Sequence, residues 1–271
     1  MVKRILAAFI LAAIGIPALF LGKIPYFVLI TVFLGIAGWE YANIFRAMKF
    51  SPSLWLTVGG VLLIMAARGF FPDLAPAVLA LVVLLAMTVH LVEYERGVDH
   101  AAADFAATLS GLVYIGWIGA YLIDLRSLGD GNDGAWYVLL VLGAMWLADA
   151  TAYFVGSPLG RHKMTPRLSP KKSWEGYWAG VAAGTLGTAG LAVLWHLLGG
   201  PDVSWWQGGL LGLVLSVVTT LGDLGESMLK RQAGLKDSSD IIPGHGGFFD
   251  RMDAWLWGGV IGYFIIVWFM H

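Results

Sequence analysis

One stretch of this chain, from Asp223 to Asp253, is rich in charged residues and lies between two long apolar segments. The charged and titratable side chains in it are Asp223, Glu226, Asp237, Asp240, Asp250 and Asp253, with Lys230, Arg231, Lys236, His245 and Arg251. Charge at membrane depth is costly and tends to mark function. We therefore expect this stretch to hold the functional site.

The first half of the stretch has the spacing of one helix face. If the apolar run that ends near Thr220 continues as a helix, positions i, i+3, i+4 and i+7 share a face. The residues at these positions are Asp223, Glu226, Ser227 and Lys230. Gly234 can end this helix, because glycine readily adopts the left-handed conformation of a C-terminal cap.

The second half combines a glycine loop with further acids. The run Pro243-Gly244-His245-Gly246-Gly247 cannot form regular helix and can bring backbone N–H groups close to a ligand. Asp250 and Asp253 follow, and their spacing puts them on one face near the start of the next helix. Carboxylates on two helix ends suit Mg²⁺, while cations and loop amides suit phosphates.

A second candidate segment covers residues 156–173, which contain no acid. Its basic residues are Arg161, Lys163, Arg167, Lys171 and Lys172. Three prolines stiffen it. It is either an ordinary basic cytoplasmic loop or, as we favour, a phosphate-binding segment.

Two acids lie inside apolar runs and are harder to interpret. Asp149 has either a direct role in the site or a structural, buried hydrogen bond, and the sequence favours neither. Glu40 lies near the end of its run. We interpret it as a carboxylate at the membrane interface.

The C-terminal pattern resembles the signature of the phosphatidate cytidylyltransferase (CDP-diacylglycerol synthase) family. The matching positions are Ser227, Lys230, Arg231, Lys236 and Asp237, then residues 243–247, then Asp250, Arg251 and Asp253. The segment from Ser169 to Gly176 also looks like a recurring family segment.

The resemblance implies that the protein converts CTP and phosphatidate into CDP-diacylglycerol and pyrophosphate. It implies Mg²⁺ on Asp223 and Asp250, with room for a second cation. The implied catalytic residues are Asp223, Asp250, Lys230, Arg231 and His245, where His245 assists the leaving pyrophosphate or shapes the loop. The implied substrate-binding residues are Lys171, Lys172, Ser169, Ser227, Lys236, Asp237, Gly246, Gly247, Arg251 and Asp253, with Asp149 as the undecided case.

The composition is that of a polytopic membrane protein. The 271 residues are 58% hydrophobic and 13% charged, with a mean hydropathy of +0.75, whereas soluble domains carry about 25% charged residues. The net charge of −1 gives no indication of a nucleic-acid partner, and we expect none. The absence of cysteine excludes disulfides, thiolate metal sites and a cysteine nucleophile.

The apolar runs predict an all-α integral membrane protein with about nine transmembrane helices. We expect a single membrane domain over residues 1–271. Spans one to five occupy residues 1–135, and a catalytic half, residues 136–271, contains cytoplasmic loops at 156–173 and 224–253. Small residues at every fourth position predict that spans seven and eight pack closely; they include Gly176, Gly180, Gly184, Gly208, Gly212 and Ser216.

The distribution of basic residues predicts the orientation. With nine spans and a cytoplasmic N-terminus, the cytoplasmic segments contain every lysine and arginine of the chain except three: Lys23, Arg68 and Arg126. This asymmetry follows the positive-inside rule. We expect a protein of the bacterial inner (plasma) membrane whose site faces the cytoplasm, with CTP, phosphatidate and the bilayer as partners; a homodimer is compatible with the sequence.

Two other functions stay open at this point. A different CTP-using membrane enzyme, such as a polyprenol kinase, would need a similar site. An anion transporter would need charges near the bilayer midplane and internal repeats, and the sequence shows neither clearly. The chain has no P-loop motif, so P-loop nucleotide hydrolysis is disfavoured.

Overall fold

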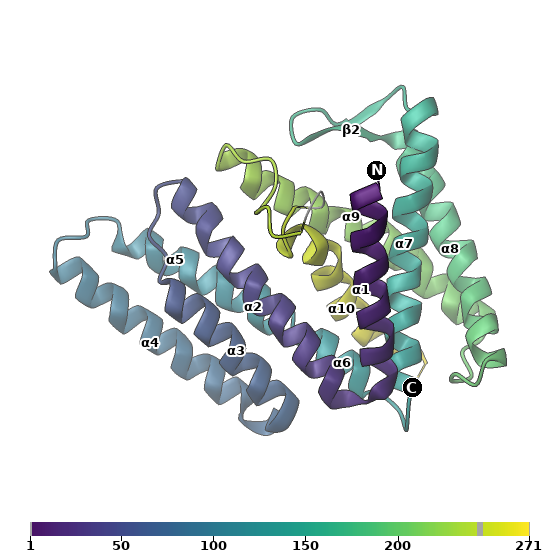
Figure 1. The fold of residues 1–271 in the computed structure, drawn as a ribbon, viewed down its shortest axis with the longest axis horizontal. Coiled ribbons are helices and arrows are strands. Elements are labelled where there is room, and N and C mark those ends of the chain that lie inside the picture. Colours follow the sequence, from purple (N-terminus) through teal and green to yellow (C-terminus); the bar gives the residue numbers. More distant parts are fainter. Residues whose placement is uncertain (1, 243–245, 271) are drawn as a thin grey trace. The chain divides into compact units, whose positions relative to one another are not determined.

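The computed structural model describes residues 2–242 and 246–270 (Figure 1). Almost all of its regular structure is helical. The elements are α1 (Val2–Leu21), α2 (Lys23–Ala47), α3 (Leu54–Phe70), η1 (Pro72–Leu74), α4 (Ala75–Glu95), α5 (Ala101–Gly111), η2 (Leu112–Trp117), α6 (Tyr121–Ser127), α7 (Asp133–Leu159), β1 (Lys163–Thr165), β2 (Ser169–Ser173), α8 (Trp174–Leu197), α9 (Trp205–Gln232) and α10 (Phe249–Phe269). The predicted all-α class is confirmed.

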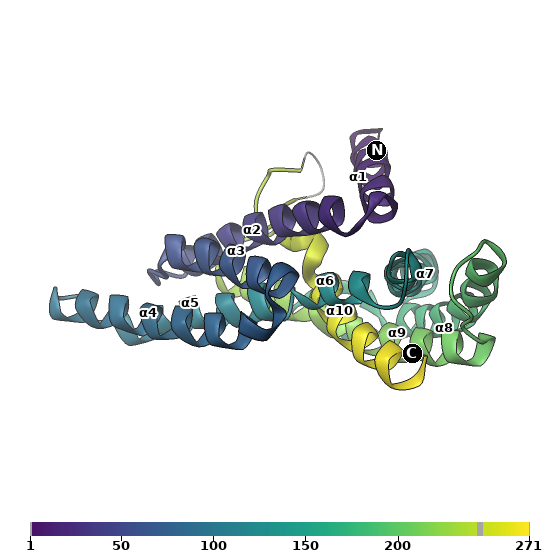
Figure 2. The ribbon, with the colours of Figure 1, turned by 90° about the horizontal axis from the view of Figure 1, so that it is seen from below.

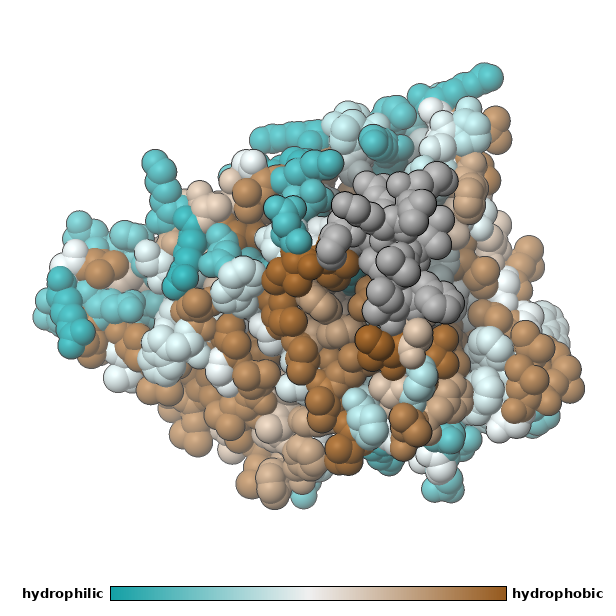
Figure 3. Space-filling view, viewed as in Figure 1, coloured by the Kyte–Doolittle hydropathy of each residue, from teal (hydrophilic) through white to brown (hydrophobic). Residues whose placement is uncertain are grey.

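The described helices match the predicted membrane spans. Seven of them are long and apolar enough to cross a membrane, and Leu11–Leu21 and Leu54–Phe70 are shorter apolar helices. Large apolar side chains remain exposed on them, such as Leu81 on α4 and Leu186 on α8. Apolar residues cover much of the molecular face in Figure 3. Such surfaces suit contact with lipid.

The chain divides into two compact units, whose relative positions are not determined. Unit 1 comprises Met1–Asp124 and Leu229–Leu256, and unit 2 comprises Leu125–Met228 and Trp257–His271. The divisions fall within α6, α9 and α10. Each unit therefore combines segments that lie far apart in the sequence.

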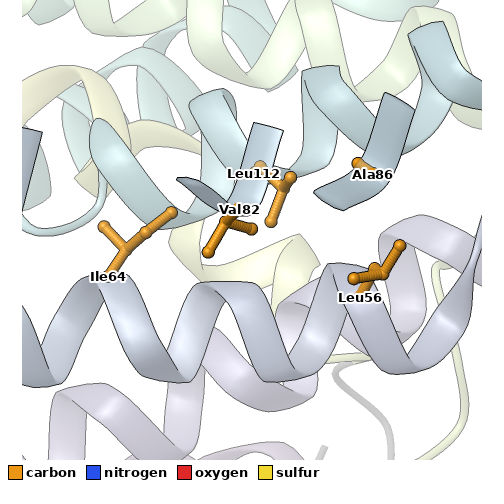
Figure 4. Packing of buried hydrophobic residues seen from close by; sticks show 5 residues of the cluster. All are labelled: Leu56, Ile64, Val82, Ala86 and Leu112. Atoms are coloured by element: carbon orange, nitrogen blue, oxygen red, sulfur yellow. The ribbon is translucent and has the colours of Figure 1, made fainter. Parts of the chain in front are cut away.

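Unit 1 is built on a helical bundle in which α2 packs on α3, α3 on α4, and α4 on α5 (Figures 1 and 2). A cluster of buried apolar side chains joins α3, α4 and η2 (Figure 4): Leu56, Ile64, Val82, Ala86 and Leu112. A Cβ atom at Gly60 would overlap the side chain of Leu112 and lie 2.9 Å from that of Val82. A residue without a side chain is therefore needed where the three elements meet.

The predicted fifth span is not one regular helix. Its α-helical start, α5, passes into the π-helical segment η2, and α6 begins only at Tyr121. π-helical turns are rare and often lie near functional sites. In unit 1, Tyr114 of η2 lies edge-on to Phe249 at the start of α10, with ring centroids 6.5 Å apart.

In unit 2, glycines allow α8 to approach two neighbouring helices. A Cβ atom at Gly176 or Gly180 would come within 2.7 Å of a backbone carbonyl oxygen of α7. A Cβ atom at Gly184 would overlap Ser216 of α9. The predicted close packing of the seventh and eighth spans is thus confirmed at Gly184, and at Gly208 and Gly212 of α9, whereas Gly176 and Gly180 face α7.

The basic segment forms a β-hairpin at the α7–α8 junction (Figure 1). β1 and β2 are antiparallel, with Thr165 opposite Ser169. The predicted loop of residues 156–173 is therefore partly wrong: α7 continues to Leu159, and the rest of the segment is mostly hairpin. Ser173 caps α8, since its Oγ accepts a hydrogen bond from the Gly176 N–H (3.3 Å).

Candidate active site

Asp250 is the best-connected acid of the predicted site. It lies in the first turn of α10, and its Oδ2 accepts hydrogen bonds from the Ser238 N–H (2.8 Å), the Ser238 hydroxyl (2.7 Å) and the Gly247 N–H (2.8 Å). Its Oδ1 forms an ion pair with Lys230 of α9. Only 6% of the Asp250 side chain and 9% of the Lys230 side chain is exposed. Unit 1 thus brings two of the predicted catalytic residues together.

The glycine loop is shaped around carboxylates. Gly246 has a φ of 79°, in the left-handed region that favours glycine, and its carbonyl accepts a hydrogen bond from the Ile242 N–H (2.9 Å). A Cβ atom at Gly247 would overlap Glu40 and Ser238. The expected role of these glycines toward phosphate stays a prediction. His245, with Pro243 and Gly244, lies outside the described residues.

Glu40 is a site residue that the sequence interpretation missed. We expected it at the membrane interface, but α2 places it in the interior, with an exposed fraction of 0%. Its two oxygens accept hydrogen bonds from Ser238, Ser239, Phe248 and Phe249. The available signal was an acid inside an otherwise apolar helix, which is a functional candidate by default.

A second cluster forms in unit 2 around Asp223. The hairpin places Lys172 in an ion pair with the Asp223 carboxylate of α9. The Ser227 hydroxyl lies 3.5 Å from the same carboxylate. Asp149 of α7 interacts electrostatically with both Lys172 and Asp223. The basic segment therefore reaches the acidic stretch at Asp223, while the role of Asp149 stays open.

The other predicted residues are distributed around these two clusters. Arg231 hydrogen-bonds the Leu235 carbonyl beyond the end of α9 (3.2 Å). Lys171, Arg231, Lys236, Asp237 and Arg251 are exposed, Ser169 is partly buried, and Ser227 and Asp253 are buried. Solvent-facing cations beside a buried acid could meet an anionic substrate, and their proposed contacts remain to be tested.

The donor chemistry of the two clusters fits a divalent cation. Carboxylate oxygens are the preferred ligands of Mg²⁺, and Asp223 and Asp250 each already neutralise one ammonium group. Asp223 belongs to unit 2 and Asp250 to unit 1, so their joint binding of one ion stays a prediction.

Known proteins resemble the chain along nearly its whole length. The model of the Cytidylyltransferase family matches residues 2–269. A phosphatidate cytidylyltransferase of Synechocystis sp. is 32% identical, covering 98% of this chain and 96% of the relative. One of Brucella abortus is 35% identical over 93% of this chain and 87% of the relative, and one of Bacillus subtilis is 31% identical over 99% and 98%. The chain therefore belongs to the cytidylyltransferase family.

Proposed function

We propose that this protein transfers the cytidylyl group of CTP to phosphatidate, forming CDP-diacylglycerol and releasing pyrophosphate. The observation that carries the proposal is the match of nearly the whole chain to relatives that bear the name phosphatidate cytidylyltransferase. The pairing of site acids with lysines in each unit supports it.

The reaction is a displacement at phosphorus. A phosphate oxygen of the lipid attacks the α-phosphorus of CTP, and the bond from that phosphorus to the bridging oxygen breaks, with its electron pair leaving on pyrophosphate. The lipid phosphate is already an anion, so the step needs no strong general base. The main obstacle is the repulsion between two anions, which positioned cations reduce.

The residues of the two clusters suit this task. Lys172 and Lys230 lie beside Asp223 and Asp250, where their ammonium groups can bind phosphate oxygens. Exposed Lys171 in unit 2, and Arg231 and Arg251 in unit 1, add further positive charge, and Mg²⁺ held by Asp223 and Asp250 would neutralise further phosphate charge. Asp149 interacts electrostatically with Lys172, and its role in the reaction stays open.

The two substrates indicate where in the cell the site lies. Phosphatidate lies in the bilayer, and CTP is a cytosolic nucleotide, so we place the site at the cytoplasmic face of the bacterial inner membrane. Since the chain has no cysteine, single cysteines at Ser169 and Asp240 would react with impermeant reagents only from the cytoplasmic side. A homodimer would show by light scattering as twice the 29.2 kDa mass of one chain.

Labelled CTP tests the reaction against the kinase alternative. Purified protein in detergent receives phosphatidate, Mg²⁺ and CTP that carries ³²P at either the α- or the γ-phosphate. Cytidylyl transfer puts the α-label into lipid and the γ-label into pyrophosphate. Transfer of the γ-label into lipid, with dolichol as the better acceptor, would instead identify a polyprenol kinase and overturn the proposal.

A further inference from the structure

Glu40 joins two segments that lie some two hundred residues further along the chain, all within unit 1. Its Oε2 accepts hydrogen bonds from the Ser238 hydroxyl (3.1 Å) and the Phe249 N–H (2.6 Å). Its Oε1 accepts from the Ser239 hydroxyl and the Phe248 N–H (3.1 Å). The carboxylate therefore joins α2 to Ser238 and Ser239 and to the start of α10.

These bonds compensate a costly burial. A carboxylate removed from water is strongly destabilised unless its oxygens receive donors or meet positive charge. Glu40 receives two backbone N–H groups from the first positions of α10, where the helix dipole also favours an anion. The surrounding rings hold the same junction: Phe248 packs on Phe33, and Phe249 on Tyr41, with centroids 4.7 and 5.8 Å apart.

Ser238 connects Glu40 to the acid of the site. Its hydroxyl oxygen lies 3.1 Å from Glu40 Oε2 and 2.7 Å from Asp250 Oδ2, and its N–H donates to the same Asp250 oxygen. One hydroxyl proton thus lies between two carboxylates. Any movement of Glu40 would shift Ser238, which supplies two of the hydrogen bonds that orient Asp250.

The glycine at position 247 fits the same arrangement. Its Cβ would overlap the Glu40 carboxylate and the Ser238 hydroxyl, while its N–H donates to Asp250. The backbone can pass between the two carboxylates only because there is no side chain there. The position of the backbone at Gly247 and that of the Glu40 carboxylate therefore depend on each other.

The geometry points to Glu40 as a positioning residue of the active site, which holds Ser238, Ser239 and the start of α10 in place and thereby orients Asp250. Glu40 acts through Ser238 and the start of α10 and has no part in the chemical step. The inference rests on the proposed function only in so far as Asp250 serves the reaction.

Replacing Glu40 by glutamine tests this role sharply. The backbone N–H groups of Phe248 and Phe249 donate to different oxygens of Glu40. Glutamine keeps the shape but has one oxygen, so one of these N–H groups must face an NH₂ group. Serine hydroxyls can reverse their direction, whereas a backbone N–H cannot.

Asp104→Asn is the matched control. Asp104 belongs to the same unit, is also 0% exposed, and likewise accepts a backbone N–H, from Ser51 (2.6 Å). Its described side-chain contacts are with His100 of the α4–α5 loop and Ser51 of the α2–α3 loop, away from the residues described as holding Asp250. Any general effect of neutralising a buried acid in unit 1 should appear in this variant too.

Three quantities are compared in detergent: kcat/KM with CTP and phosphatidate, the Mg²⁺ concentration at half-maximal rate, and hydrogen exchange of residues 238–242 and 246–253. We expect Glu40→Gln to lower kcat/KM about ten- to hundred-fold, as loss of a charge-assisted hydrogen bond would. The half-maximal Mg²⁺ concentration should rise several-fold, and the two segments should exchange at least about ten-fold faster. Asp104→Asn should change none of these.

Wild-type values for Glu40→Gln, or a slow variant with unchanged exchange in both segments, would overturn the inference. So would equal effects of Asp104→Asn. If Glu40→Gln does not fold, Ser238→Ala replaces it, because it removes the hydroxyl that joins the two carboxylates; wild-type behaviour of that variant would also contradict the inference. If the wild-type protein does not turn over CTP with phosphatidate, the proposed function fails, while the exchange comparison still decides the role of Glu40.

Discussion

The two acids that we assign to the metal are held in opposite ways. In unit 1, Asp250 accepts three hydrogen bonds from Ser238 and Gly247, pairs with Lys230, and leaves 6% of its side chain exposed. In unit 2, Asp223 pairs with Lys172 and leaves 40% of its side chain exposed. Preorganised groups need little rearrangement during reaction. We infer that Asp250 is fixed in advance, whereas Asp223 and Lys172 can adjust to the substrate.

The largest effects should come from the two acids themselves. Asp223→Asn and Asp250→Asn keep the side-chain shape and remove the charge, and each should lower CTP turnover at least about a thousand-fold. Only Asp250→Asn should also destabilise the fold, because it breaks an ion pair with Lys230 in a buried site, which costs about 3–5 kcal/mol. The loss of the more exposed Asp223 pair should cost about 1 kcal/mol or less.

Turnover and thermal unfolding in detergent measure both effects, with Asp202→Asn as control, since the Asp202 side chain is 88% exposed. Equal destabilisation by the two site variants would contradict the contrast between a fixed and an adjustable acid. Full activity of either variant would remove that acid from the site.

A smaller effect should follow from adding a side chain at Gly247, next to the Glu40 carboxylate. Gly247→Ala places a Cβ atom against Glu40 and Ser238; overpacking of this kind costs about 1–3 kcal/mol. We expect a ten- to hundred-fold loss of kcat/KM. Gly59→Ala in α3 is the control, because its Cβ would meet no atom of the described residues within 4 Å. Unchanged kinetics of Gly247→Ala would mean that the loop can move without disturbing Asp250.

The two neighbouring lysines of the hairpin should differ, and Lys171→Ala should have the smallest effect. Lys172 pairs with Asp223, whereas Lys171 is exposed. Lys172→Ala should lower kcat/KM about ten- to hundred-fold, because a charge-assisted contact is worth roughly 1.5–3 kcal/mol. Lys171→Ala should lower it only a few-fold. Steady-state assays at fixed ionic strength compare kcat/KM of the two variants. A larger loss for Lys171→Ala than for Lys172→Ala would assign the phosphate contact to Lys171.

Local patterns predicted much of the fold and of this site. Helix spacing placed Asp223, Ser227 and Lys230 correctly on α9, and Gly234, with a φ of 72°, lies just beyond the end of that helix, as expected. Apolar runs of membrane-spanning length predicted the helices themselves. These features depend on neighbours within a few residues, which the sequence displays directly.

The sequence could not show contacts made across long distances along the chain. The sequence around Glu40 does not reveal its buried position, because its four hydrogen-bond donors lie far along the chain, at residues 238, 239, 248 and 249. The hairpin was missed because its strands are short and rich in proline and lysine, which are poor strand formers. The pairing of Lys172 with Asp223 depends on that hairpin, so its geometry was hidden as well.

Direct measurement of metal binding tests the central claim, that these two differently held acids share one divalent ion. Mn²⁺, a paramagnetic substitute for Mg²⁺, is titrated into wild-type protein, Asp223→Asn, Asp250→Asn and the control Asp202→Asn, and free Mn²⁺ is read from its electron paramagnetic resonance signal. We predict that each site variant lowers the affinity at least about ten-fold and that the control leaves it unchanged. Wild-type Mn²⁺ affinity in either site variant would contradict the shared ion.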